Sequence, residues 1–251
     1  MASILLALSL LSGCVAAAPF PAPAATASDP RSLNLTDAAR AHLIPLALYG
    51  ATAGRPKPLA LISHGYGGRN TEHSFIARAL AGRGYVVASV QHEIEGDAPM
   101  PSTGEPAIVR RPFWERGAAS LRFVIAELQR RRIATRAPVV LIGHSNGGDT
   151  SMLLATGHPE LVRTVFTLDN RRMAVPRVAS PRVCSVRSSD QPADPGVLPG
   201  EAEQRAHDMV IARILGLLHN DMSDAATPAQ QASMLYYLFR CLDGAPPISR
   251  P

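Results

Sequence analysis

The stretch Val139-Val-Leu-Ile-Gly-His-Ser145-Asn-Gly-Gly148 decides the fold of this chain. Residues 139–142 form a short apolar run, which is typical of a strand that is covered on both faces. Small residues at 143 and 147 let the chain turn sharply around Ser145, because a side chain there would collide across the turn. The stretch DTSMLLA that follows is compatible with a helix. These residues predict a strand, a strained turn with an exposed serine hydroxyl, and a helix N-terminus beside it.

Further apolar runs of this kind recur outward from the turn, at residues 59–63, 85–90, 161–168, 183–186 and 209–218. Amphipathic patterns lie between them, and the clearest one places Trp114, Ala118, Leu121, Ile125 and Leu128 on one helix face. A last helix is predicted after Thr227-Pro-Ala-Gln230, which offers a capping box with proline at the first helical position, and Gly244 ends it. Alternating strands and helices predict an α/β domain with a mainly parallel sheet and helices on both faces.

Composition limits the class of protein. The chain has 251 residues, a formal net charge of +5 and 46% hydrophobic residues, which suits one globular domain and excludes a disordered chain or a small cystine scaffold. Lys57 is the only lysine among the 25 basic residues, and the arginines are scattered except for the run at 130–132. That run is typical of a helix C-terminus, where cations oppose the helix dipole. We therefore expect no nucleic-acid partner.

The N-terminus predicts the compartment. Residues 1–13 are uncharged and mostly apolar, too short to span a bilayer, and they end in Leu11-Ser-Gly-Cys14, which resembles a bacterial lipobox. We predict cleavage before Cys14 and a lipid anchor on it; plain secretion stays an alternative, because no Lys or Arg precedes the apolar run. Val15 at the next position points to the outer membrane, by resemblance to Gram-negative lipoproteins. Residues 14–31 read as an Ala/Pro-rich tether, and 32–251 as the folded domain.

A second motif, His64-Gly-Tyr66-Gly-Gly68, ends the apolar run at 59–63. Its glycines allow close approach of the backbone to a substrate, so we predict an oxyanion hole from the N–H groups of Tyr66 and Asn146. His64, His144 and His219 lack the spacing of metal ligands, and we expect no metal and no cofactor.

A base must follow the serine in the chain, with an acid between them. His158, His207 and His219 qualify by order, and His219 is favoured because it closes the run at 209–218 and opens the loop to the last helix.

Three aspartates are candidates for the acid. Asp190 is favoured, with Asp194 next, because both lie in the loop after the second strand beyond the serine. Asp169, at the end of the first such strand, is the third candidate.

These motifs together resemble the α/β-hydrolase superfamily over about residues 40–243. The run from Ile44-Pro45 through the His64 motif to Gly84-Tyr-Val-Val-Ala-Ser is similar to predicted dienelactone hydrolases and the platelet-activating-factor acetylhydrolase-like group. Dienelactone hydrolase proper uses a cysteine where this chain has Ser145. The resemblance implies a serine hydrolase that cleaves small-molecule or polymer esters through Ser145, His219 and Asp190 and an acyl-enzyme. An amidase or peptidase with the same triad, and a non-catalytic binding lipoprotein on this fold, are the alternatives.

The surroundings of the site are partly predicted. Only about a dozen residues separate Asp169 from the next strand, so no large lid domain is expected there. The irregular segment 93–111 is expected to form one wall of the site. His92, Trp114 and Tyr66 are candidate pocket residues, with core packing as the alternative for Trp114. Cys184 and Cys241 either pair or remain buried thiols.

Overall fold

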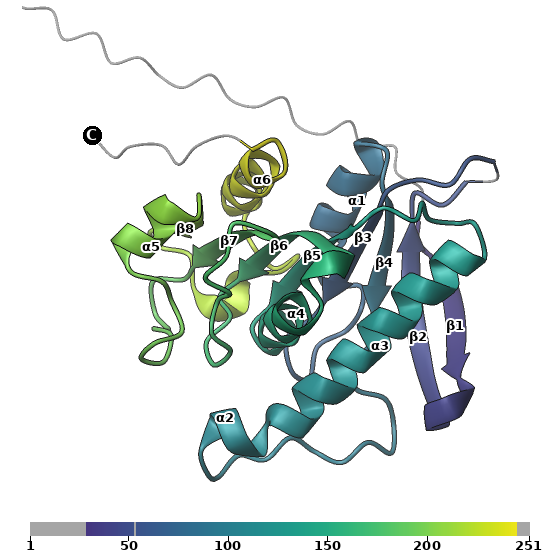
Figure 1. Cartoon of the computed structure of the whole chain (residues 1–251), viewed down its shortest axis with the longest axis horizontal. Coiled ribbons are helices and arrows are strands. Elements are labelled where there is room, and N and C mark those ends of the chain that lie inside the picture. The colour runs from purple at the N-terminus through teal and green to yellow at the C-terminus, as the bar shows by residue number, and fades with distance from the viewer. Residues whose placement is uncertain (1–28, 53, 245–251) are drawn as a thin grey trace, which may run out of the picture.

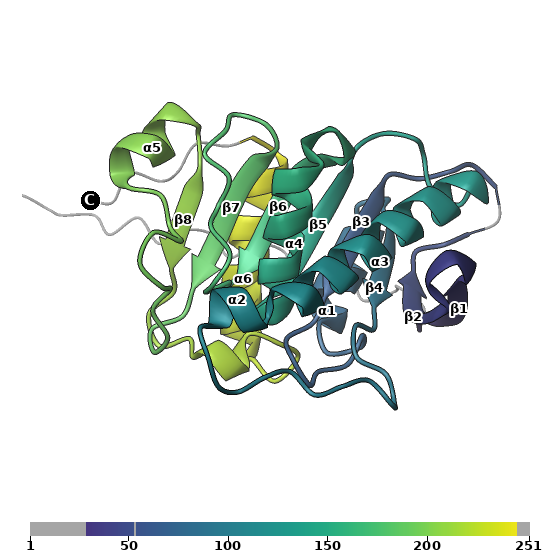
Figure 2. The same cartoon turned by 60° about the horizontal axis from the view of Figure 1, so that its bottom comes forward.

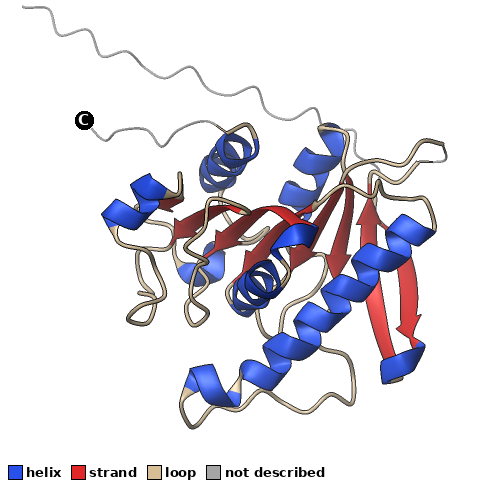
Figure 3. Cartoon of the chain, viewed as in Figure 1, coloured by secondary structure: helices blue, strands red, loops and turns tan. Residues whose placement is uncertain are grey.

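A computed structural model describes residues 29–52 and 54–244 of the chain. The predicted leader over residues 1–13, the predicted lipidation site Cys14 and the tether up to residue 28 lie outside the described residues. The described chain forms an eight-stranded sheet with helices packed on both sides (Figures 1, 2 and 3). This arrangement confirms the predicted α/β architecture.

The sheet is parallel except at one edge. Its strands lie in the order β1-β2-β4-β3-β5-β6-β7-β8, in which β2 is antiparallel to both β1 and β4. The remaining neighbours are parallel, so the carboxyl ends of six strands share one edge of the sheet. The strands are β1 Arg31–Asp37, β2 His42–Tyr49, β3 Leu59–Ser63, β4 Val86–Val90, β5 Val139–His144, β6 Val162–Leu168, β7 Arg182–Arg187 and β8 Val210–Arg213.

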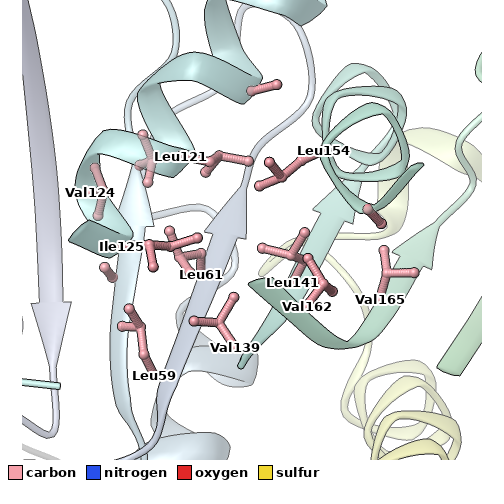
Figure 4. Close-up of a cluster of buried hydrophobic side chains, with 14 of the residues drawn as sticks. Leu59, Leu61, Leu121, Val124, Ile125, Val139, Leu141, Leu154, Val162 and Val165 are labelled. Carbon is pink, nitrogen blue, oxygen red and sulfur yellow. The ribbon is translucent and has the colours of Figure 1, made fainter. Parts of the chain in front are cut away.

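Two pairs of helices cover the two faces of the sheet. The apolar faces of α3 and α4 pack on one side of the central strands (Figure 4), and those of α1 and α6 pack on the other. Both layers are built from side chains that are almost fully withdrawn from solvent, which supplies the main favourable term for folding. The helices are α1 Ser74–Gly82, α2 Pro106–Val109, α3 Arg111–Arg130, α4 Asn146–Gly157, α5 Glu201–Ala206 and α6 Pro228–Leu242.

Most predicted elements are present, and the ends of two helices follow the predicted signals. The side chain of Thr227 accepts a hydrogen bond from the Gln230 N–H at the start of α6, and Gly244 follows the helix with φ of 71°. Arg130 ends α3, where it and Arg131 both pair with Glu127. Two of the three arginines of that run therefore form ion pairs at the end of α3, as the sequence indicates.

One predicted strand is too long. The apolar run at 209–218 is a strand only as far as Arg213, where its pairing with Arg187 of β7 ends. Gly216 then turns the chain with φ of 74°, and the side chain of Leu215 is exposed. His219 therefore lies beyond the strand, at the start of the one-turn helix His219–Asp221, rather than at the strand's end.

The connection between β6 and β7, where no large lid was expected, is short. Residues 169–181 join β6 to β7 without a helix, which confirms that no large lid domain is inserted at this point. Cys184 and Cys241 form a disulfide that links β7 to α6, so the question left open for these two cysteines is answered in favour of pairing. None of the helices that the structure describes is long and apolar enough to cross a bilayer.

Candidate active site

Ser145 occupies the turn between β5 and α4, at the carboxyl edge of the sheet. Its backbone has φ of 50° and ψ of −118°, a conformation that non-glycine residues adopt only under strain. The Ser145 N–H donates to the Leu168 carbonyl oxygen at 2.8 Å, which ties the turn to the end of β6. The strained turn predicted from the sequence is therefore present, with the serine at its apex.

The glycines around Ser145 are required by close contacts. A Cβ at Gly143 would lie 2.3 Å from the carbonyl oxygen of Gly147. A Cβ at Gly147 would in turn lie 2.3 Å from the carbonyl oxygen of Ser63, at the end of β3. Neither distance is compatible with a side chain, so glycine at both positions lets α4 begin directly against the central strands.

His219 contacts the serine. Its Nε2 lies 2.9 Å from Ser145 Oγ, and its side chain is buried in the one-turn helix His219–Asp221. The carbonyl oxygen of His219 accepts a hydrogen bond from His144 Nε2 at 3.0 Å. Burial, followed by the neighbouring His73 and His219 rings, lowers the pKa of His144 to about 3, so His144 is neutral and donates this bond. Of the three candidate histidines, His219 is thus the one that the structure places beside Ser145.

The acid beside His219 is Asp169, and the expectation that Asp190 occupies this place is wrong. Asp169 Oδ2 lies 2.6 Å from His219 Nδ1, and the carboxylate is 0% exposed. Asp169 directly follows β6, which is the neighbour of β5 in the sheet, and its φ of 60° turns its side chain into the site. The error came from assigning the acid to the loop after β7, although the loops after β6 and β7 both open at this edge.

Asp169 is held as a carboxylate by its partners. Burial acts to raise its pKa, but hydrogen bonds from His219 and Ser188 and the positive charge of Arg187 together lower it below the usual value. Ser188 donates its hydroxyl at 2.7 Å and its N–H at 3.2 Å, and Arg187 Nη2 lies 2.8 Å from Oδ1. The sequence reasoning missed Arg187 and Ser188; their position at the end of a strand that faces the same edge was the available signal.

Asp190 and Asp194 have other contacts. Asp190 is exposed, and its Oδ1 accepts a hydrogen bond from the backbone N–H of His219 at 2.8 Å. Asp190 thus holds the main chain of the residue whose ring Asp169 holds. Asp194 forms an ion pair with Arg172 and does not contact His219. The acidic loop after β7 therefore supports the histidine from outside the site.

The predicted oxyanion groups lie beside Ser145. Asn146 is the first residue of α4, where the backbone N–H groups have no partner within the helix. On the other side, a Cβ added to Gly65 would lie 3.5 Å from Ser145 Cβ, so the turn that carries Tyr66 runs directly past the serine. The structure thus brings Tyr66 and Asn146 to the same residue.

Three side chains fix the turn that carries Tyr66. His64 Nδ1 lies 2.7 Å from the Gly65 carbonyl oxygen, while its Nε2 accepts a hydrogen bond from the His92 N–H. Burial lowers the pKa of His64, which leaves its ring neutral with the proton on Nδ1. Gln91 donates to the carbonyl oxygen of Gly68 at 3.0 Å. Tyr66 itself is 49% exposed, and its hydroxyl accepts a hydrogen bond from the Met100 N–H. The segment after β4 therefore holds this turn in place. Part of it is Met100, which belongs to the segment 93–111 that was predicted to form a wall of the site.

Trp114 is part of the core and not of a pocket surface. Its side chain is buried, and its Nε1 donates to Asn146 Oδ1 at 2.6 Å. The indole therefore holds the first residue of α4 in place from the adjacent helix α3. His92 is buried as well, which leaves Tyr66 as the one exposed side chain among the three predicted pocket residues.

A further buried carboxylate, Asp149, was not anticipated. Its Oδ1 accepts hydrogen bonds from the backbone N–H groups of residues 171–173, at 2.8–3.1 Å. Burial outweighs these bonds and raises the pKa of Asp149 to about 6. Asp149 fastens the segment after Asp169 to α4, so the acid and the serine are connected through one helix. Among the described residues, no group of three or more His, Cys, Asp or Glu side chains could hold a metal ion.

Comparison with known proteins identifies the fold of the chain. No protein-family model matches the chain. Solved structures do match. One is a carboxylesterase from a metagenomic library, with 16% identity over 88% of this chain and 90% of that one and a TM-score of 0.62. Another is a ferulic acid esterase from Streptomyces cinnamoneus, with 18% identity over 88% of this chain and 92% of that one and a TM-score of 0.65. A dienelactone hydrolase-like promiscuous phosphotriesterase from metagenomic libraries is similar too, with 15% identity over 85% of this chain and 97% of that one and a TM-score of 0.65. The chain has the α/β-hydrolase fold.

Proposed function

We propose that this protein is a serine hydrolase of carboxylic esters, with Ser145 as nucleophile, His219 as base and Asp169 as acid. The observation that carries the proposal is the continuous contact from Ser145 Oγ through the imidazole to the buried Asp169 carboxylate. A nucleophile, a base and a group that orients the base is the arrangement that activates a serine hydroxyl. Several solved structures of the same fold are esterases, which supports the choice of ester substrates.

Each group has a definite task in the reaction. His219 Nε2 takes the hydroxyl proton of Ser145 as Oγ bonds to the substrate carbonyl carbon, and the carbonyl oxygen becomes negative. The imidazolium then gives that proton to the alcohol oxygen as the C–O bond breaks, leaving an acyl group on Ser145. Water repeats the two steps, with its proton passing through His219, to release the acid. Asp169 keeps the Nδ1 proton directed toward itself and stabilises the imidazolium.

The negative oxygen needs donors that already point at it. In this proposal they are the N–H groups of Asn146 and Tyr66, which flank Ser145 from α4 and from the turn after β3. Asn146 is held by Trp114, and the Tyr66 turn by His64 and Gln91. Such prearranged donors typically contribute about 100- to 1,000-fold in rate each.

The exposed apolar side chains beside the site indicate the substrate's character. Tyr66 and Leu218, the residue before His219, are both exposed although they are large and apolar. With no lid in the β6–β7 connection, these side chains can contact the acyl or alcohol part of an ester directly. We therefore expect uncharged esters with an apolar acyl or alcohol group as substrates.

Labelling with a fluorophosphonate probe tests the nucleophile. We expect the parent protein to be labelled and Ser145→Ala to be unlabelled, with turnover of p-nitrophenyl esters lower by about a millionfold. Ser233→Ala is the matched control, because its hydroxyl bonds only to the Ala229 carbonyl oxygen on the surface of α6. An unlabelled parent, or labelling that survives Ser145→Ala, would overturn the proposal. Labelling together with hydrolysis of amides but not of esters would change the substrate class and keep the mechanism.

We also propose that the protein is anchored in the bacterial cell envelope through a lipid on Cys14. The support is the lipobox at residues 11–14 and the disulfide between Cys184 and Cys241, because disulfides persist in oxidising compartments. Membrane fractions should contain the parent chain, and Cys14→Ser should move it to the soluble fraction. An equal distribution of both proteins would contradict the anchor.

A further inference from the structure

We propose that the protein carries a second binding site, which takes a phosphate-bearing anion. The site is a cavity of about 520 Å³, within the size range of small-molecule pockets. We call it the arginine pocket, and it is lined by Arg55, Pro56, Gln129, Arg130, Arg132, Ala134, Thr135 and Arg136.

The arginine pocket lies at the opposite edge of the sheet from Ser145. Its lining residues precede β3 and β5, whereas Ser145 follows the carboxyl end of β5. Because a strand advances about 3.3 Å per residue, the six residues of β5 separate the two sites by roughly 20 Å. The pocket is therefore separate from the proposed active site.

The pocket concentrates positive charge without balancing it. Four of its lining residues are arginines, and none is acidic. Arg130 is paired with Glu127 at 2.8 Å. In the part of the chain that the structure describes, Arg55, Arg132 and Arg136 have no acidic partner. The side chains of all four arginines are exposed, so their guanidinium groups are free to move toward a bound anion and contact it.

A second cavity on the same helix shows that this imbalance is not general. That cavity, of about 480 Å³, also contains arginines from or near α3. There, however, Asp37 is part of the lining, and it pairs with Arg40 at 2.6 Å. An acidic residue is thus part of the lining of the second cavity, whereas none is part of the lining of the arginine pocket.

The backbone that carries the arginine pocket is a fixed frame. The two walls are joined by backbone bonds, from the Lys57 N–H to the Ile133 oxygen at 3.3 Å and from the Thr135 N–H to the Lys57 oxygen at 2.9 Å. The positions of the walls are therefore set before any ligand binds.

These features favour phosphate chemistry. The planar guanidinium group binds two oxygens of a phosphate at once. The cavity is larger than a single phosphate ion, so it has room for the group to which the phosphate is attached. A free phosphorylated molecule and the headgroup of an anionic phospholipid share this chemistry.

Calorimetric titration with inorganic pyrophosphate tests the site directly. The full-length chain with Cys14→Ser should be used, so that no lipid anchor contributes. We expect saturable binding that weakens with added salt, and a loss of at least about tenfold in affinity for Arg132→Gln/Arg136→Gln. Arg205→Gln, which removes the same kind of charge from exposed α5, should change the affinity by less than about twofold. Circular dichroism checks that each variant is folded; if the double variant is not, Arg55→Gln on the other wall replaces it.

Vesicle sedimentation identifies the source of the phosphate. Vesicles of phosphatidylcholine with and without phosphatidylglycerol are compared. Binding to the anionic vesicles that needs Arg132 and Arg136 indicates a lipid headgroup, and pyrophosphate binding alone indicates a free phosphorylated molecule. The proposal is overturned if neither probe binds, or if the pocket variants bind as the parent does. Neither measurement depends on hydrolysis, so the outcome is independent of the proposed esterase activity.

Discussion

The ends of β6 and β7 each supply one aspartate to His219, and the two aspartates do different work. Asp169, after β6, is fully buried and contacts the imidazole, while Asp190, after β7, is exposed and contacts the backbone N–H. Asp169 has a cation, Arg187, as a partner in addition to Ser188. The difference shows that proximity to the histidine residue alone does not identify the candidate acid: what distinguishes Asp169 is its contact with the imidazole ring together with its burial.

The largest expected effect comes from exchanging the two carboxylates for amides. Asp169→Asn should lower turnover on the order of 10,000-fold, because an amide neither stabilises the imidazolium nor selects the tautomer with a proton on Nδ1. Asp190→Asn keeps an oxygen for the His219 N–H and should retain activity within about threefold. Steady-state kinetics with one p-nitrophenyl ester measures both. A loss in Asp190→Asn as large as in Asp169→Asn would remove the distinction between the two loops.

Arg187 is expected to give the next largest effect. Arg187→Met leaves Asp169 buried with one partner fewer, so we expect a loss of about 100-fold in turnover from misplacement of the acid and about 3–5 kcal/mol in the free energy of unfolding. Because the positive charge of Arg187 lowers the pKa of Asp169, its removal should raise that pKa, so the acid side of the pH–rate profile should move to higher pH.

Two variants separate this effect from a general loss of structure. Arg187→Lys restores the charge and should recover much of the activity and the parent profile. Arg213→Gln removes a nearby arginine that contacts only the Ser188 carbonyl oxygen, and it should leave the profile in place. A parent-like profile in Arg187→Met would show that Arg187 does not act through Asp169.

The smallest of these effects on activity is expected for the outer aspartate when its contact is removed. Asp190→Ala deletes the acceptor of the His219 N–H, and the loss of one partly buried hydrogen bond should cost about fivefold in turnover. Comparison with Asp190→Asn isolates that bond, since only the acceptor oxygen differs in function. Equal activities of the two variants would mean that the bond has no part in placing His219.

The sequence was sufficient for the strands from β3 onward, apart from the end of β8, but not for β1 and β2. It was also sufficient for two residues of the proposed triad, Ser145 and His219. The run 139–148 predicted a strand, a turn and a helix, because the turn leaves no space for a side chain at 143 or 147 and both residues are glycine. It was not sufficient for the acid, because parallel strands bring several loops to one edge and only side-chain reach selects among them. The sequence did not predict the ion pair of Arg187 with Asp169 either, because the two residues come from the ends of different strands and only their side chains bring them together. Asp149 carried no local signal, since its three donors come from a segment beyond the next strand.

Asp149 contrasts with Asp169. Both are buried carboxyl groups, but the hydrogen bonds to Asp149 come only from neutral backbone N–H groups, and its pKa is raised rather than lowered. Its pKa is about 6 when folded against 3.8 ordinarily, so the carboxyl group binds a proton more tightly in the folded state. Its ionisation therefore costs stability above about pH 6, and the cost disappears below about pH 4, where both states are protonated. Asp149→Asn should unfold at higher denaturant than the parent at pH 7, by about 1–3 kcal/mol, and at the same denaturant near pH 4. Asp243→Asn, at an exposed carboxylate, controls for general charge effects. A variant that is less stable at pH 7 but not at pH 4 would show that the Asp149 charge stabilises the fold, as the Asp169 charge does.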